Sequence, residues 1–476
     1  MEEVLKPDLC VIGAGSGGLS VAAAAAQFGV PVVLIEKGRM GGDRLNFGDV
    51  PSKALLAAGK RADAVRTAST FGIDVIEAQI DHRGVHDHVH GVIAAIAPND
   101  SIERFTGLGV RVIQAKANFL DKNTVEAGRV LVHARRFVIA TGSTPVIPSI
   151  SGLDEVPYLT NETIFDVSER IQHLIVLGGG PFGLELGQAH SMLGSHVTIF
   201  DTEGFLPNED PEATAVLLKR LEDTQIMLYP NTRVEKVERS MQGVAVHFHK
   251  DGETVIVKGT HLLVATGRKP NVKSLSLERA GVTYTDEGIK VNEQLKTSNR
   301  RIYAIGDVIG GPQYSHLATY HAGIVVRNAL FRLKPDVSAG TIPRVIYTAP
   351  ELAQVGITEA EAHARYRRRR IRIYRWPYAD IDRAQCDRET EGFIKVITKR
   401  DGTILGCTIV GAQAGELLQL WVMAMAKDIK IGDLISLVVP YPTLSELSKR
   451  AAYAYYQPNM TRGWMRSVIG LLRRLG

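Results

Sequence analysis

The sequence predicts an α/β protein in which a strand, a glycine turn, a helix and a second strand follow one another twice. The first copy begins with the apolar run Leu9 to Gly13, continues through a glycine-rich turn and an alanine-rich stretch, and ends at Glu36. The second copy occupies Leu174 to Asp201. In both copies the closing acid lies eighteen residues after the third glycine of the turn. From Thr341 onward, β-branched runs and amphipathic stretches without such a turn predict a C-terminal α+β domain.

The glycines of each turn have separate roles. Gly13 permits a tight turn, Gly15 lets the backbone approach a pyrophosphate, and Gly18 allows the helix to pack closely on the strand. The corresponding glycines of the second copy are Gly178, Gly180 and Gly183. Phosphates bind at a helix N-terminus, and the closing acids Glu36 and Asp201 should accept hydrogen bonds from a ribose. The pattern predicts two Rossmann-like dinucleotide-binding domains.

The surroundings of Asp201 indicate which nicotinamide cofactor is used. Its carboxylate would repel the 2′-phosphate of NADPH, and the next residues, Thr202, Glu203 and Gly204, include no arginine to bind that phosphate. The sequence therefore favours NADH over NADPH.

The segment from Gly41 to Lys53 reads Gly-Gly-Asp-Arg-Leu-Asn-Phe-Gly-Asp-Val-Pro-Ser-Lys. It resembles the signature of the pyridine nucleotide-disulfide oxidoreductases, flavoenzymes that include dihydrolipoamide dehydrogenase, glutathione reductase and mercuric reductase. In that family two cysteines of the segment form the disulfide that takes electrons from reduced flavin. Here Arg44 and Asp49 stand at those places. Neither side chain can perform thiol–disulfide exchange, which requires a thiolate.

Other motifs occur in the order of that family. Ala140-Thr141-Gly142 and Ala265-Thr266-Gly267 each close a β-rich stretch, Ile302 to Asp307 resembles the second FAD motif, and Tyr347 to Glu351 resembles the entry to the dimerisation domain. The resemblance implies a homodimer with an FAD domain at 1–150 and 271–340, an NAD domain at 151–270 and a C-terminal α+β dimerisation domain at 341–476. It also implies cofactor contacts at Gly42, Thr141, Gly142, Gly267, Gly306 and Asp307.

The resemblance further implies that Lys53 and Glu185 form an ion pair beside flavin N5, where hydride arrives from the nicotinamide. Arg44 and Asp49 should lie on the opposite flavin face, on the first turns of one helix. One interpretation is a structural salt bridge between them that fills the space of the lost disulfide. The other is that Asp49 raises the cost of reduced anionic flavin, while Arg44 offsets that charge or holds an acceptor.

The C-terminal motif also departs from the family. Members that act on lipoamide or glutathione carry a His-Pro-Thr motif, with a glutamate further on, in which the histidine moves protons for the thiols. Here the run from Pro440 to Glu446 has Tyr441 at the histidine's place and keeps the glutamate. Tyrosine, with a pKa near 10, is a poor base at neutral pH. The absent base and the absent cysteines together argue against dithiol chemistry.

Cysteine and histidine usage indicates no metal site. Of the three cysteines, Cys10 and Cys407 lie in apolar runs and should be buried, and Cys386 has no partner nearby in sequence. His82, His86 and His90 would share one helix face, but no second cluster completes a metal site, so a solvated helix is the preferred interpretation.

The C-terminal tail carries the basic excess of the chain. The last thirty residues contain six Lys/Arg and no Asp/Glu, and the remainder has 50 basic against 51 acidic side chains. No general nucleic-acid surface is expected. A helix over Thr461 to Gly476 would place apolar side chains on one arc and arginines on the other, which suits peripheral contact with a membrane or docking on the dimer. The N-terminus lacks the features of a signal peptide, so a cytoplasmic location is expected.

Taken together, these features predict a homodimeric FAD enzyme that passes electrons from NADH directly to a small non-disulfide acceptor such as a quinone. One alternative is a disulfide or metal-ion reductase that uses thiols from elsewhere, such as Cys386 or another protein. Another is a non-catalytic FAD-binding scaffold, against which the intact nicotinamide-site residues count.

Overall fold

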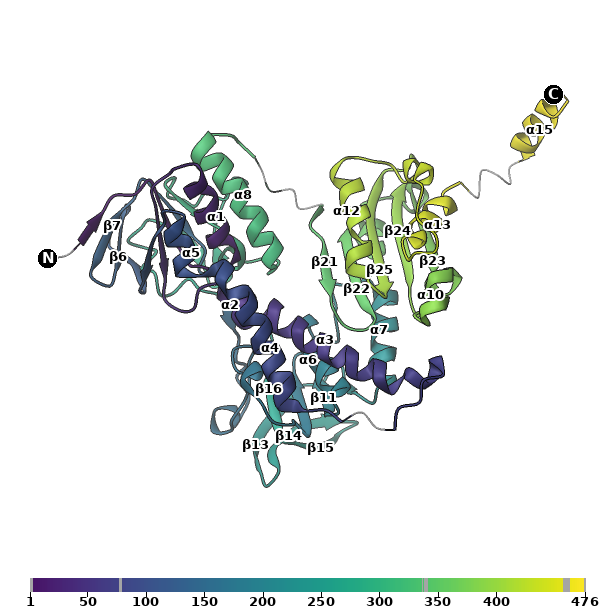
Figure 1. Cartoon of the computed structure of the whole chain (residues 1–476), viewed down its shortest axis with the longest axis horizontal. Coiled ribbons are helices and arrows are strands. Elements are labelled where there is room, and N and C mark those ends of the chain that lie inside the picture. The colour runs from purple at the N-terminus through teal and green to yellow at the C-terminus, as the bar shows by residue number, and fades with distance from the viewer. Residues whose placement is uncertain (1–2, 77–78, 336, 338–340, 457–462, 475–476) are drawn as a thin grey trace. The chain divides into compact units, whose positions relative to one another are not determined.

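The computed structural model describes residues 3–76, 79–335, 337, 341–456 and 463–474. Two compact units make up the chain. The first unit comprises Met1–Thr202 and Tyr229–Val337, and the second comprises Glu203–Leu228 and Ser338–Gly476 (Figure 1).

The first unit begins with a three-layer arrangement built on a five-stranded parallel sheet. In spatial order its strands are β20 (Ile302–Ala304), β8 (Arg136–Ile139), β2 (Leu9–Ile12), β3 (Val32–Glu36) and β4 (Arg111–Gln114). Successive side chains of a strand point to opposite faces. Leu9 and Val11 therefore pack toward the helices, whereas Cys10 and Ile12 pack toward a second sheet.

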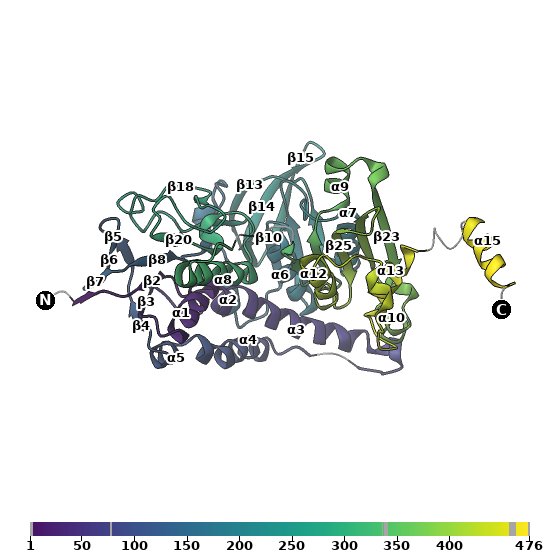
Figure 2. The ribbon, with the colours of Figure 1, turned by 90° about the horizontal axis from the view of Figure 1, so that it is seen from above.

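The helical layer consists of α1 (Ser16–Gln27) and α8 (Ser315–Phe331), which lie side by side (Figure 2). The two helices approach closely at Gly17, where a Cβ would lie 3.2 Å from the carbonyl oxygen of Ala318. On the other face lies a four-stranded sheet in the order β1 (Glu3–Leu5), β7 (Val130–His133), β6 (Thr124–Ala127) and β5 (Ala117–Phe119). Its buried aromatic residue Phe119 stacks edge-on against Phe137 of the parallel sheet, with ring centroids 5.4 Å apart.

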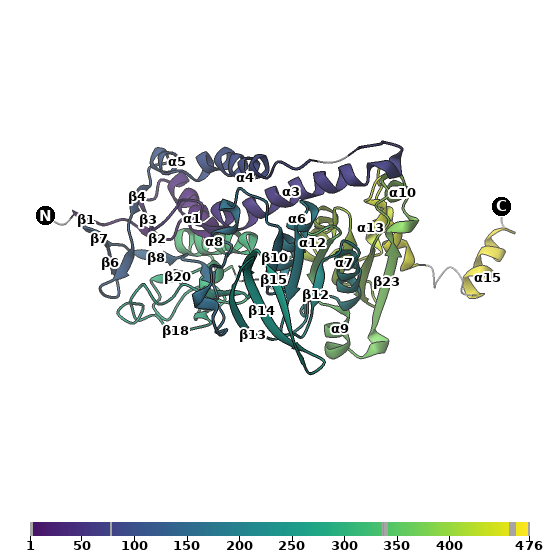
Figure 3. The same cartoon turned by 90° about the horizontal axis from the view of Figure 1, so that it is seen from below.

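The second copy of the repeat forms a further parallel sheet. Its order is β12 (Met227–Tyr229), β11 (His196–Phe200), β10 (His173–Leu177) and β16 (His261–Val264), and α6 (Pro181–Met192) follows β10. An antiparallel sheet of β13 (Val234–Ser240), β14 (Gly243–Lys250) and β15 (Glu253–Gly259) packs on it around Phe200 and Phe248 (Figure 3). The predicted α/β class with two strand–turn–helix units is confirmed.

Connecting elements complete the first unit. They are α2 (Gly42–Asn46), α3 (Asp49–Arg66), α4 (His82–Ile96), α5 (Ile102–Gly107), the short ribbon β9 (Ser143–Pro145) with β17 (Arg268–Pro270), and the hairpin β18 (Tyr284–Thr285) with β19 (Gly288–Ile289). Short 3-10 turns are η1 (Ala68–Phe71), η2 (Ala97–Asp100), η3 (Leu153–Glu155), η4 (Ile164–Asp166) and η5 (Gly306–Ile309). The long α3 packs along both α4 and α6.

The second unit is an antiparallel sheet with helices, as the α+β prediction requires. The sheet order is β21 (Arg344–Ile346), β22 (Glu351–Gly356), β25 (Ile404–Gly411), β24 (Phe393–Lys399) and β23 (Ile371–Pro377). Its helices are α7 (Pro211–Asp223), α9 (Glu359–Arg365), α10 (Asp382–Asp387), α11 (Ala414–Leu417), α12 (Gln419–Ala426), α13 (Glu446–Ala454) and α15 (Gly463–Leu472). Fully buried Trp421 and Tyr378 lie in its core, and Trp421 Nε1 donates to Ser448 Oγ at 3.0 Å.

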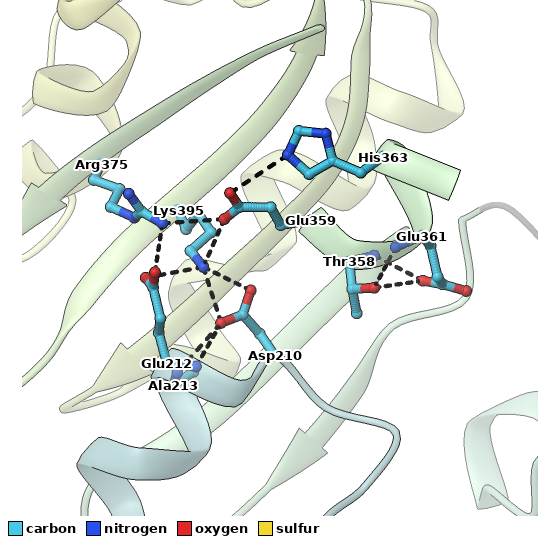
Figure 4. Close-up of polar contacts among 9 residues, drawn as sticks. All are labelled: Asp210, Glu212, Ala213, Thr358, Glu359, Glu361, His363, Arg375 and Lys395. Atoms are coloured by element: carbon cyan, nitrogen blue, oxygen red, sulfur yellow. Dashed lines mark hydrogen bonds and ion pairs between the residues drawn. The ribbon is translucent and has the colours of Figure 1, made fainter. Parts of the chain in front are cut away.

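A buried charge cluster joins α7 to the sheet of the second unit (Figure 4). Lys395 of β24 is 1% exposed, and its Nζ lies 2.8 Å from Asp210, 3.0 Å from Glu212 and 3.1 Å from Glu359. Arg375 of β23 contacts both glutamates. Asp210 also caps α7 by accepting hydrogen bonds from the first-turn amides. One buried carboxylate therefore both begins the helix and anchors it.

Candidate active site

The first glycine turn follows β2 and begins α1. A Cβ on Gly18 would lie 1.9 Å from the carbonyl oxygen of Gly13, so helix and strand can approach this closely only with glycine there. Gly15 is the N-cap of α1, and a Cβ built on it would meet no atom within 4 Å. An open glycine face beside helix-terminal amides is the geometry that a pyrophosphate needs.

Glu36 closes this first turn. Its Oε2 accepts a hydrogen bond of 2.6 Å from the Ala14 amide, and its Oε1 accepts one of 2.7 Å from Gly38. A carboxylate has about four acceptor positions, so Glu36 retains capacity for a ribose hydroxyl beside the turn that it orders.

The second turn repeats the first in geometry. A Cβ on Gly183 would lie 2.0 Å from the carbonyl oxygen of Gly178, and Gly180 is the N-cap of α6 with no atom within 4 Å of its Cβ position. Asp201 Oδ2 accepts a hydrogen bond of 2.7 Å from the Gly179 amide, as Glu36 does from Ala14. The repeat read from spacing is therefore also a structural repeat.

The signature segment lies against the first turn but does not form one helix. Gly42 has a φ of 59°, and a Cβ there would lie 2.7 Å from Gly15 Cα. Helix α2 then ends at Asn46, and α3 starts at Asp49 after a break at Phe47 and Gly48. The expectation that Arg44 and Asp49 share the first turns of one helix is wrong, because the backbone at Gly48 leaves the helical region.

Of the two interpretations of Arg44 and Asp49, the one in which they form a salt bridge with each other is wrong. Arg44 Nη2 instead donates to Asp100 Oδ2 at the end of η2, and the Asp100 side chain is 10% exposed. Asp49 accepts a hydrogen bond from Ser315 Oγ at the start of α8. The two residues that replace the cysteines are held by different segments of the chain.

Lys53 and Glu185 form the expected ion pair. Lys53 Nζ lies 2.8 Å from Glu185 Oε2, and the Glu185 side chain is 3% exposed. Asp49 Oδ1 lies 4.0 Å from the same ammonium group. Lys53 therefore carries its charge between a buried carboxylate and a half-exposed one, and Asp49 adds negative charge to this end of α3.

The two Ala-Thr-Gly triplets lie at the ends of the ribbon formed by β9 and β17. Thr141 and Gly142 follow β8, and Gly267 follows β16. The Asn271 amide donates to Gly142 O at 3.0 Å, and Val146 N donates to Gly267 O at 2.9 Å. Thus each triplet closes one end of the ribbon.

Gly306 and Asp307 begin η5 after β20. Asp307 Oδ2 accepts a hydrogen bond of 2.6 Å from Ser143 Oγ, and the Gly306 amide donates to His321 Nδ1 at 3.3 Å. Burial lowers the pKa of His321 to about 4.

Sequence reasoning missed four polar residues around this motif: Asp43, Ser143, Asn161 and Arg268. Arg268 binds Ser143 and Asp43, and Asn161 also binds Asp43. A signal was available, since Ser143 and Arg268 each follow an Ala-Thr-Gly triplet directly.

Tyr441 and Glu446 belong to the second unit. Tyr441 is 70% exposed, and its hydroxyl donates to Asp382 Oδ2 at 2.7 Å. That hydrogen bond, followed by the Asp382 charge, raises the pKa of Tyr441, so the phenol remains a donor at neutral pH. Glu446 begins α13. As expected, Cys10 and Cys407 are buried, whereas Cys386 on α10 is exposed.

The histidine cluster lies on α4, as predicted, but it is less solvated than expected. His90 Nε2 bonds Phe165 O at 3.0 Å, while His82 and His86 line a small cavity with His190. Burial, then the charges of His261 and His82, lower the pKa of His190 to about 4. Within the described ranges no group of three or more His, Cys, Asp or Glu side chains is arranged to hold a metal ion.

The tail helix spans Gly463–Leu472, and the predicted flanking positions Thr461, Arg462, Leu475 and Gly476 lie outside the described residues. Its side chains Val468, Ile469, Leu471 and Leu472 are 44% to 61% exposed. Among the helices described, none combines the length and apolarity needed to cross a membrane.

The residues present fit two dinucleotide cofactors. Both turns offer an open glycine face at a helix N-terminus, and both carry an ordered carboxylate after the next strand. Gly15, Gly42, Glu36 and Asp307 would hold FAD, and Gly180 and Asp201 would hold the nicotinamide cofactor.

Comparison with known proteins agrees with this geometry. The family model for pyridine nucleotide-disulphide oxidoreductases matches residues 7–322, and that for the family's dimerisation domain matches 342–452, which supports a homodimer. Mercuric reductase of Lysinibacillus sphaericus is 34% identical over 451 residues, covering 94% of this chain and 82% of that protein. Dihydrolipoyl dehydrogenase of Bacillus subtilis (strain 168) is 33% identical over 457 residues, covering 94% and 96%.

Solved structures give the same result. LpdA from Mycobacterium tuberculosis superposes with a TM-score of 0.86 at 27% identity, covering 94% of this chain and 99% of that one. The flavoprotein disulfide reductase RclA from Escherichia coli, as a Cu(II) complex, gives 0.84 at 25% identity with the same coverage. With two dinucleotide-binding domains and a dimerisation domain, the chain belongs to the pyridine nucleotide-disulphide oxidoreductase family, whose enzymes use FAD and NAD(P)H.

Proposed function

We propose that the protein oxidises NADH and passes the electrons through FAD directly to a non-disulfide acceptor such as a quinone. NADH, a proton and a quinone become NAD⁺ and a hydroquinone, a transfer of two electrons. FAD, when bound, supplies a hydride acceptor that can release electrons singly or in pairs. The observation that carries the proposal is that Arg44 and Asp49 stand at the two cysteine places of the signature.

The charged residues of the candidate site have different roles in the proposed reaction. The Lys53–Glu185 pair orders the nicotinamide side and leaves no unpaired buried charge there. Asp49 adds negative charge beside Lys53 and disfavours an anionic reduced flavin. Because Arg44 forms an ion pair with Asp100, we favour a structural role for Arg44 over a role in binding the electron acceptor.

The nicotinamide is NADH in this proposal. The Asp201 carboxylate is fixed on the Gly179 amide at 2.7 Å, where it would face the ribose and repel a 2′-phosphate. Thr202, Glu203 and Gly204 provide no counter-charge for such a phosphate.

A dithiol reaction is the second candidate, because relatives carry the names mercuric reductase and disulfide reductase. It would need a thiol from outside the signature. Cys386 is exposed and lies on α10, the helix that also carries Asp382, the hydrogen-bond partner of Tyr441. Cys386 has no described cysteine as a disulfide partner.

Anaerobic rapid mixing of the holoenzyme with NADH, and in parallel with NADPH, tests the proposal. The flavin absorbance should bleach without a long-wavelength thiolate–flavin band, and faster with NADH. Quinone turnover should persist after complete thiol alkylation. A thiolate band, or loss of turnover on alkylation with FAD retained, favours the dithiol reaction. Absence of bleaching favours a scaffold, and equal or faster reduction by NADPH contradicts the NADH assignment.

We further propose that the tail brings the enzyme to its acceptor by peripheral contact with anionic lipid. Helix α15 exposes the apolar side chains of Val468, Ile469, Leu471 and Leu472, and Arg473 and Arg474 follow directly. A basic amphipathic helix of this kind lies in the headgroup region of a bilayer. Lipid-soluble quinones would then be the natural acceptor.

A further inference from the structure

The ribbon of β9 and β17 is the place where the chain leaves the first parallel sheet and returns to it. Arg268 pairs with Pro145, and Pro270 pairs with Ser143, in an antiparallel register. The ribbon is closed at one end by Asn271, whose side-chain amide donates to Thr141 O at 2.9 Å while Thr141 Oγ1 donates to Asn271 O at 3.1 Å. The position of β9 and β17 therefore depends on the hydrogen bonds between Thr141, in the first Ala-Thr-Gly triplet, and Asn271.

Arg268 makes three side-chain hydrogen bonds at this ribbon. Its Nε donates to Ser143 Oγ at 2.8 Å, and its Nη2 donates to Ser143 O at 3.0 Å and to Asp43 Oδ1 at 3.1 Å. Ser143 Oγ in turn donates to Asp307 Oδ2 at 2.6 Å. One guanidinium thus links helix α2, which carries Arg44, to the aspartate of the second FAD motif.

The link made by Arg268 is also electrostatic, because the Arg268 charge acts on the carboxylate of Asp43. Burial raises the pKa of Asp43, the Arg268 charge lowers it, and the charges of Asp307 and Asp49 raise it. Asp43 is therefore paired directly with the Arg268 guanidinium, and Asp307 is linked to the same guanidinium through the Ser143 hydroxyl. Removal of the guanidinium would leave them to repel each other in a partly dry site.

The Asp43 oxygen that Arg268 binds also accepts a hydrogen bond from a second side chain. Asn161 Nδ2 donates to Asp43 Oδ1 at 2.9 Å, and a Cβ on Gly48 would lie 2.6 Å from Asp43 Oδ2. The carboxylate fits between the ribbon and the break separating α2 from α3. Asp43 thus lies against Gly48, the residue directly before α3, and α3 carries Asp49 and Lys53.

We propose that Arg268 is a positioning residue for the flavin site. Arg268 binds Asp43 on α2 directly and binds Asp307 through Ser143, and so fixes the distance between these two carboxylates. The signature segment and the second FAD motif would then enclose the cofactor together. This role of Arg268 does not depend on which electron acceptor the enzyme uses. If Arg268 has this role, its substitution should change FAD affinity and the flavin midpoint potential, and not only folding stability.

The experiment compares Arg268→Gln with Lys269→Gln, a matched loss of one positive charge at an exposed position on the same strand. FAD binding to the apoprotein is measured by quenching of flavin fluorescence, and the flavin midpoint potential is measured on the holoenzyme. R268Q should raise the FAD dissociation constant about tenfold or more, as loss of a charge-assisted hydrogen bond does. It should also shift the potential. K269Q should change neither.

Two further variants separate positioning from folding. In the double variant D43N/R268Q part of the lost FAD affinity should return, because the uncompensated carboxylate is gone. S143A keeps the Arg268–Asp43 pair and should weaken FAD binding less than R268Q, providing a milder test if R268Q does not fold. The proposal is overturned if R268Q and S143A bind FAD as K269Q does, or if R268Q lowers only the thermal midpoint of the apoprotein.

Discussion

At the scale of single residues, the buried imidazole of His321 fixes a protonation state next to the second FAD motif. His321 is 4% exposed, and its Nδ1 accepts a hydrogen bond from the Gly306 amide. Nδ1 can accept only while it carries no proton. The lowered pKa of about 4, caused by burial, keeps the ring neutral at pH 7.

We expect His321 to make the holoenzyme acid-sensitive. Because the folded pKa of about 4 lies below the unfolded value of about 6.5, the contribution of His321 to stability is complete above pH 6.5 and is lost as pH falls toward 4. His321→Asn keeps an acceptor without a titration, so its thermal midpoint and FAD retention should fall less over that range. The exposed His88→Asn is the control and should follow the wild type. Identical acid profiles for H321N and wild type would contradict the assignment.

Local spacing explains which residues could be placed from the sequence. The closing acids Glu36 and Asp201 were readable because strand, turn and helix lengths fix their distance from the glycines. The partners of Arg44 and Asp49 were not readable, because Asp100 and Ser315 are far away along the chain and reach the signature only through the packing of other helices.

At the scale of elements, α7 shows how a connection can belong to a different unit from the strands that it joins. In chain order it lies between β11 and β12, yet Glu203–Leu228 clusters with the C-terminal sheet. Lys395 is 1% exposed and Asp210 is fully buried. Burial alone would lower the pKa of Lys395, but the hydrogen bonds that its ammonium group donates to three carboxylates raise the pKa overall, so the ammonium stays charged (Figure 4).

Lys395→Met should therefore destabilise the protein strongly. Removal of one partner leaves buried Asp210 without its counter-charge, which typically costs about 3–5 kcal/mol. Urea unfolding should show the loss, and Asp210→Asn in the K395M background should recover part of it, although the cap on α7 is weakened. Exposed Lys427→Met is the control. A loss below about 1 kcal/mol, the range of surface pairs, would show that the cluster does not anchor α7.

The elements themselves were predictable where their pattern is periodic and local. Both strand–turn–helix units follow from the sequence, with ends that differ by one or two residues, and a helix carrying His82, His86 and His90 was expected where α4 lies. The ribbon and the Lys395 cluster were not predictable, because strand pairing between β9 and β17 and a buried lysine depend on contacts between distant segments. A lone lysine in an apolar run gives no sign of its partners.

At the scale of the whole molecule, charge is distributed so that the tail differs from the rest. The last thirty residues contribute six basic side chains and no acidic one, whereas the remainder has a net charge of −1. In a homodimer the two tails would act together, so weak contacts of each tail with one lipid surface reinforce each other. Four arginines per tail, at about 1 kcal/mol each near an anionic surface, suffice for reversible binding.

Deletion of Thr461 to Gly476 should then abolish co-sedimentation with vesicles of mixed anionic and neutral lipid, and slow the reduction of long-chain quinones embedded in them. Reduction of short soluble quinones should not change, because the residues proposed to bind FAD belong to the first unit and the tail belongs to the second. A second variant separates charge from apolar burial. It replaces Arg466, Arg473 and Arg474 by Gln, keeps the apolar side chains, and should weaken lipid binding in proportion to the charge removed. Binding should also fall with added salt for the wild type. If the truncated protein instead dissociates into monomers or loses FAD, the helix stabilises the dimer, and contact with lipid is not its role.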